Sequence, residues 1–84
     1  MQISRGTVVR SKAGHDKGCF FVVVGMDGEM ALLSDGRKRT EATPKRKNRL
    51  HIAPTSTVLD EQTMKEDSKI SNALDAFYKR VRAD

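Results

Sequence analysis

The segment from Gly6 to Phe20 constrains the fold more than any other part of this chain. Its β-branched run Thr7-Val8-Val9 is typical of a strand, and the apolar run from Cys19 to Val24 is typical of a second one. The polar loop between them contains Gly14 and Gly18, either of which can hold a positive φ that a Cβ would resist. We therefore expect a strand, a basic glycine loop and another strand.

Further strands are predicted from two hairpin signals. Asp27-Gly28 and Asp35-Gly36 flank an apolar run, and Asp and Gly both tolerate the positive φ of a type I′ turn. The continuous apolar character of residues 19–25 indicates burial on both faces. Five short strands with Gly-rich turns predict a mainly β domain, a small closed or partly closed barrel. The predicted strands are 7–12, 19–25, 29–34, 37–41 and 48–53.

The last third of the chain has a different pattern. Pro54 marks a boundary, and residues 55–67 are polar, which predicts a linker with one helical turn near Asp60. Apolar residues at a spacing of three or four then predict an amphipathic helix from Ser68 to Arg82. The apolar stripe along this helix either packs back on the barrel or docks in the groove of a partner protein. The stripe consists of Ile70, Ala73, Leu74, Phe77 and Val81. The predicted units are a barrel (1–54), a linker (55–67) and a C-terminal helix (68–84).

The positive charge is concentrated in the predicted barrel. The chain has 16 Lys and Arg against 11 Asp and Glu, a net charge of +5. Residues 1–53 carry 11 basic and 5 acidic side chains, net +6, whereas residues 54–84 carry 5 and 6, net −1. This distribution is suited to a polyanion, or to a merely solvated surface. A chain of 84 residues also has little room for a deep active-site pocket.

The densest charge lies between Arg37 and Arg49, a run with seven basic residues and one acid. Pro44 prevents a regular helix through the run, so we expect a strand end and an extended loop. Such a loop can follow a phosphate backbone, although basic loops that bind nothing are common. Arg46 and Lys47 follow Pro44 in a polar setting and are expected to be exposed.

Signals for catalysis or metal binding are weak. His15 adjoins Asp16, but neighbouring residues often point apart and no nucleophile lies near them in the sequence. His15 and His51 lack the Cys or carboxylate cluster of a metal site. Phe20 and Phe21 belong to an apolar run, which favours core positions over a platform for stacking bases. We expect no enzyme activity, no metal and no cofactor.

Cys19, the only cysteine, has no partner for an internal disulfide and is expected to be a small buried residue. This fits a reducing cytosol. No apolar stretch approaches the roughly 20 residues that span a bilayer, and the N-terminus lacks the apolar core of a signal peptide. We expect a monomeric cytoplasmic protein without a membrane partner.

The strand–glycine loop–strand segment resembles the KOW motif of ribosomal proteins and transcription elongation factors. The similarity extends from about Arg5 to Pro54 and includes LLSDGRKR (32–39), PKRKN (44–48) and His51. This order is similar to small stand-alone bacterial KOW proteins, which themselves resemble certain archaeal and eukaryotic large-subunit ribosomal proteins. Residues 55–84 lie outside the similarity.

The resemblance implies an SH3-like barrel and a non-catalytic RNA-binding module associated with the ribosome or translation. It implies ribosomal RNA as the partner, with ribosomal or translation proteins as further ones. The alternative is a protein-interaction adaptor, because SH3-like barrels host many functions. The implied RNA-binding residues are Arg10, Lys12, His15, Lys17 and Gly18 in the motif, and Arg37, Lys38, Arg39, Lys45, Arg46, Lys47 and Arg49 in the basic segments.

Overall fold

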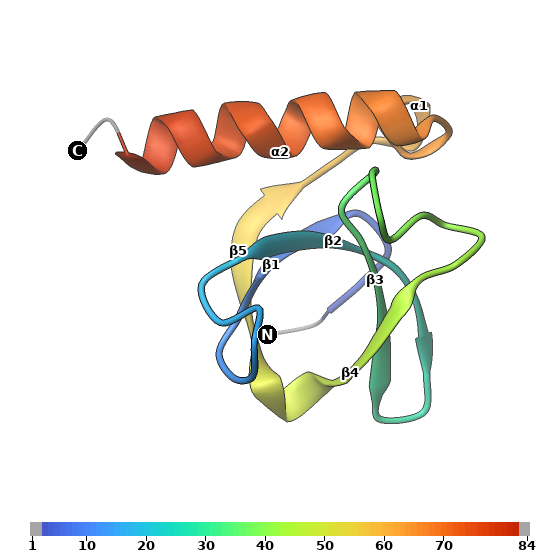
Figure 1. Cartoon of the computed structure of the whole chain (residues 1–84). Coiled ribbons are helices and arrows are strands. Elements are labelled where there is room, and N and C mark those ends of the chain that lie inside the picture. Colours follow the sequence, from blue (N-terminus) through green and yellow to red (C-terminus); the bar gives the residue numbers. More distant parts are fainter. Residues whose placement is uncertain (1–2, 83–84) are drawn as a thin grey trace.

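The computed structural model describes residues 3–82, with side chains up to residue 80 in the last helix (Figure 1). Five antiparallel strands form one sheet in the order β4-β3-β2-β1-β5, and a long helix follows them. The elements are β1 (Thr7–Ser11), β2 (Phe20–Asp27), β3 (Met30–Ser34), β4 (Lys45–Asn48), the 3-10 helix η1 (Arg49–His51), β5 (Ile52–Val58), α1 (Glu61–Met64) and α2 (Asp67–Arg82). The predicted mainly β domain with a C-terminal helix is confirmed.

The sheet is curved (Figure 1), but its strand-to-strand hydrogen bonding does not close into a ring. β4 pairs with β3 and β5 pairs with β1, so these two strands are the edges of the sheet. η1 joins one edge to the other, and within the described residues β4 and β5 do not pair with each other. The strands therefore form an open sheet.

Both faces of the sheet are buried at residues 7–9 of β1 and 21–23 of β2, as the continuous apolar run in β2 predicts. One face packs Val9, Phe21 and Val23 against residues of β3 and β5. The other face packs Val8 and Val22 against the helices. The helical side chains in this second core are Met64 of α1 and Ile70, Leu74 and Phe77 of α2. The apolar stripe of α2 thus covers the sheet, although the side chain of Val81 lies outside the described residues.

The first hairpin has a different turn from the one expected. Asp27 pairs with Met30, so Gly28 and Glu29 form a two-residue loop. Gly28 has φ +60°, and no non-glycine residue from 3 to 82 has a positive φ. A type I′ turn needs positive φ at both central residues, whereas type II′ needs it only at the first. The dihedral pattern fits type II′.

Two predicted strands are wrong in the second half of the sheet. Residues 37–41 are a loop, and β4 begins only at Lys45. The predicted strand 48–53 is split between the end of β4, η1 and the start of β5. The segment predicted as a linker, 55–67, begins within β5, which continues through Pro54 to Val58. Pro54 is tolerated because β5 is an edge strand with hydrogen-bonding neighbours on one side only.

The helical boundaries agree with the sequence more closely. α2 runs from Asp67 to Arg82, one residue longer than predicted. The turn expected near Asp60 is α1, and the Asp60 carboxylate accepts a hydrogen bond from the Thr63 backbone N–H at 2.8 Å. This is an N-cap, which satisfies one of the free amides at the start of a helix. No helix in the described part of the chain is long and apolar enough to cross a bilayer.

Candidate nucleic-acid interface

The loop between β1 and β2, residues 12–19, is tightly hydrogen-bonded. Gly14 and Gly18 have φ values of +87° and +90°, as the sequence predicts for at least one of them. Backbone bonds run from Lys17 N to Gly14 O (3.2 Å) and from Cys19 N to Asp16 O (2.9 Å). Gly18 N donates to Ser11 O at 2.9 Å, at the base of the loop. These bonds give the exposed residues His15 and Lys17 a defined position.

Asp16 lies at the centre of a polar cluster that joins this loop to β4. Its Oδ1 accepts hydrogen bonds from Ser11 Oγ at 2.7 Å and from Lys47 Nζ at 2.8 Å. Its Oδ2 forms an ion pair with Lys45 Nζ at 2.6 Å. Lys47 Nζ also donates to Ala13 O at 2.8 Å. We call Ser11, Asp16, Lys45 and Lys47 the Asp16 cluster.

The Asp16 cluster is largely shielded from water. Only 12% of the Asp16 side chain and 11% of the Lys47 side chain are exposed. Burial alone would raise the pKa of the Asp16 carboxyl, because it disfavours the charged form. The hydrogen bonds from Lys45, Lys47 and Ser11 outweigh burial and hold that pKa well below its usual range. Asp16 is therefore a stable carboxylate that attaches the loop to β4.

This cluster shows that the predicted exposure of Lys47 is wrong. Lys45 and Lys47 were both expected to contact RNA, and Lys47 was expected to be exposed. Instead, β4 pairs with β3 and directs both ammonium groups to Asp16. The single Asp16 carboxylate compensates one of their two positive charges, and both ammonium groups are engaged in attaching the loop to β4. Only Arg46 between them is exposed as expected, in an ion pair with Asp27 at 2.8 Å.

Neighbouring alanine substitutions in β4 should therefore differ in effect. Arg46→Ala removes an exposed ion pair and should change the free energy of unfolding by about 0.5 kcal/mol or less. Lys47→Ala leaves Asp16 and the Ala13 carbonyl with fewer donors and should cost about 1–3 kcal/mol. Urea unfolding of both variants at pH 7 measures the difference. Equal stability of the two variants would contradict the assignment of Lys47 to the protein interior.

Two further predicted RNA contacts lie in exposed or partly exposed ion pairs. Arg37 Nη2 contacts Asp75 Oδ2 of α2 at 2.7 Å, and its Nε donates to Ser71 Oγ at 2.7 Å. Arg49 pairs with Glu29. Exposed pairs of this kind contribute little to stability. The Arg49 guanidinium can therefore exchange its carboxylate partner for a phosphate at small cost.

Five of the basic residues that are predicted to bind RNA have no acidic partner among residues 3–80. All five are exposed, three from β1 and the loop after it and two from the loop after β3. They are Arg10, Lys12, Lys17, Lys38 and Arg39. Uncompensated charge in water is what a polyanion requires of a protein surface. These residues are the strongest candidates from the sequence-based set.

The loop after β3 is ordered around Asp35. Its Oδ1 accepts hydrogen bonds from the backbone N–H groups of Arg37 and Arg39 at 2.8 and 3.0 Å. The Arg39 carbonyl in turn accepts from Ser34 Oγ at 2.7 Å. The DGRKR segment is therefore a compact turn, and the exposed side chains of Lys38 and Arg39 project from an ordered backbone.

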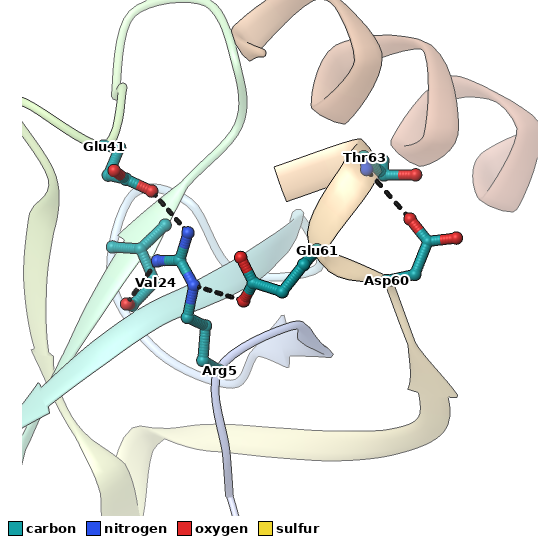
Figure 2. A network of polar contacts seen from close by, with 6 residues as sticks. All are labelled: Arg5, Val24, Glu41, Asp60, Glu61 and Thr63. Atoms are coloured by element: carbon teal, nitrogen blue, oxygen red, sulfur yellow. Dashed lines mark hydrogen bonds and ion pairs between the residues drawn. The ribbon is translucent and has the colours of Figure 1, made fainter. Parts of the chain in front are cut away.

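Arg5 has a structural role that sequence reasoning missed (Figure 2). Its Nη2 contacts Glu41 at 2.7 Å, its Nε contacts Glu61 at 2.8 Å, and its Nη1 donates to Val24 O at 2.9 Å. The hydrogen bonds that Arg5 donates to the carboxylates of Glu61 and Glu41 raise the pKa of Arg5. Arg5 links the start of the chain to the loop after β3 and to α1. No local pattern reveals such contacts, because the partners lie 36 and 56 residues away.

Cys19 is exposed, contrary to the sequence-based expectation. It precedes β2, and its backbone forms the base of the loop, so its side chain lies outside the core. His15 and His51 are also exposed. Within the described residues, no group of three or more His, Cys, Asp or Glu side chains is arranged to hold a metal ion.

Neither a model of a known protein family nor a curated protein matches this chain.

Proposed function

We propose that this protein is a non-catalytic RNA-binding module that acts on the ribosome or in translation. In this proposal the curved sheet is an SH3-like barrel of the KOW type, with ribosomal RNA as the partner. The observation that carries the proposal concerns the β1–β2 loop, which the Asp16 cluster holds in place. This loop presents two exposed basic residues without acidic partners among the described residues, Lys12 and Lys17. A preformed basic loop loses little conformational entropy when it binds a phosphate backbone.

The binding mode follows from which side chains are accessible. Phe21 is buried, and the half-buried Phe20 ring contacts Phe77 and Tyr78, with ring centres 4.8 and 5.0 Å apart. These rings are occupied within the protein, so base stacking on them would require a rearrangement. Recognition in this proposal therefore rests on phosphate, sugar and shape contacts, with weak sequence selectivity.

The apolar face of α2 offers little support for the alternative of a docking adaptor. Ile70 and Leu74 are buried against β1 and β2, so they are occupied within the chain. An adaptor would have to use another part of the surface.

Salt dependence tests the proposed function directly. If the basic surface neutralises about four phosphates, the logarithm of the affinity should fall with the logarithm of salt concentration with a slope of about −2.8 to −3.6. Raising salt from about 50 to 200 mM should then weaken binding by roughly 50- to 150-fold. The measurement is a fluorescence titration of a structured fragment of large-subunit ribosomal RNA at several salt concentrations. Absence of binding at low salt, or affinity independent of salt, would contradict the proposal.

A further inference from the structure

A shallow hollow lies between the β1–β2 loop and the last turns of α2. The residues that line it are Lys17, Gly18, Cys19, Asp75, Tyr78 and Lys79. Lys17 and Lys79 are both exposed, and neither has an acidic partner within the described side chains. The one acid in the lining, Asp75, is already paired with Arg37 at 2.7 Å. The hollow therefore carries two uncompensated ammonium groups from segments 62 residues apart.

The two sides of the hollow are held in a fixed relation. The Phe20 backbone N–H donates to the Tyr78 hydroxyl at 2.7 Å, directly beyond the loop. The Phe20 ring packs edge-on against both Phe77 and Tyr78. The end of α2 is thereby attached to the start of β2, and Lys79 follows Tyr78 on the same turn. The backbone segments that carry Lys17 and Lys79 are thus held together on the two sides of the hollow.

The chemistry of the hollow fits a phosphate group better than a base. Most of its lining residues are exposed, so it is an open surface hollow and not an enclosed cavity. Tyr78 is engaged with Phe20 through its hydroxyl and its ring. Gly18 adds no side chain, and a Cβ built on it would meet no atom within 4 Å, so a ligand can approach the backbone there. Two ammonium groups beside an open glycine can hold a phosphodiester.

We propose that this hollow binds a phosphate of the RNA backbone, with Lys17 and Lys79 as its two cationic contacts. The inference rests on the proposed function and extends it, because it makes α2 part of the RNA-binding surface. α2 lies outside the segment that resembles the KOW motif.

The test compares Lys79→Ala with Lys65→Ala, since Lys65 is also exposed but lies between α1 and α2, away from the hollow. The probe is the same ribosomal RNA fragment. Removal of one phosphate contact should make the log–log salt slope shallower by about 0.7–0.9. The loss of affinity of Lys79→Ala should therefore be about 3-fold greater at 50 mM than at 200 mM salt. Lys65→Ala should have a nearly unchanged slope.

A double variant tests whether the two lysines share one phosphate. Lys17→Ala with Lys79→Ala should lose less affinity than the product of the two single losses. Thermal unfolding of each variant should match the wild-type protein, because the substituted side chains are exposed. Equal behaviour of Lys79→Ala and Lys65→Ala, with wild-type binding intact, would overturn this inference alone. Absence of wild-type binding would overturn the proposed function as well.

Discussion

Gly36→Ala should destabilise the fold by about 3–5 kcal/mol, the sum of a strained backbone and a steric clash. Gly36 has φ +75°, a conformation that L-residues rarely adopt. A Cβ at this position would lie 2.3 Å from Asp67 O and 2.7 Å from Ser71 N, both in the backbone of α2. Backbone atoms of a helix cannot rotate away as the end of a side chain can. The first turn of α2 would have to move away from the sheet.

Gly18→Ala is the matched control for this prediction. Gly18 has a similar φ of +90°, but a Cβ there would meet no atom within 4 Å. Gly18→Ala should therefore lower the free energy of unfolding only by the backbone strain, about 1–2 kcal/mol. Urea unfolding of both variants, followed by circular dichroism, measures the difference. If the two substitutions cost the same, the close approach of α2 to the Asp35-Gly36 turn is wrong.

The sequence predicted the parts of the fold that local patterns determine. β1, β2, β3 and α2 begin and end within two residues of the predicted limits, because apolar runs, Asp-Gly turns and helical spacing mark them. β4 has no such pattern, since its sequence is KRKN. It is a strand because it pairs with β3 and because Lys45 and Lys47 find Asp16. Those contacts are tertiary, so local propensity could not reveal them.

The types of residue in the candidate site could be predicted from the sequence, but the side chains that each of them contacts in the fold could not. The sequence indicated a basic glycine loop and basic segments, and the exposed cations Lys12, Lys17 and Lys38 agree with that surface. It could not separate cations directed outward from those directed inward. Lys45 and Lys47 lie about 30 residues after Asp16, and only folding brings the three together. Lys79 was overlooked for the same reason, since the hollow that it lines together with Lys17 depends on the Phe20–Tyr78 contact.

Asp16→Asn should destabilise the protein at pH 7 by about 3 kcal/mol. The amide has nearly the same shape as the carboxylate, so the change removes charge without opening a cavity. It leaves Lys47, only 11% exposed, without a counter-charge, and Lys45 loses its ion pair as well. Asp27→Asn is the control, because Asp27 forms an ion pair of the exposed kind with Arg46. Its cost should be within about 0.5 kcal/mol.

The cost of Asp16→Asn should also depend on pH in a defined direction. The pKa of Asp16 is lowered in the folded protein, whereas in the unfolded chain it is near the ordinary value of about 3.9. The stabilisation from the carboxylate is therefore complete above about pH 5 and is lost as pH falls below about 4 toward the lowered folded pKa. Urea unfolding of both proteins from pH 7 down to pH 2 should show their free energies of unfolding converging. A difference that stays constant over this range would show that the Asp16 carboxylate titrates alike in the folded and unfolded chains. The Asp16 cluster would then not be the charged attachment that holds the loop to β4.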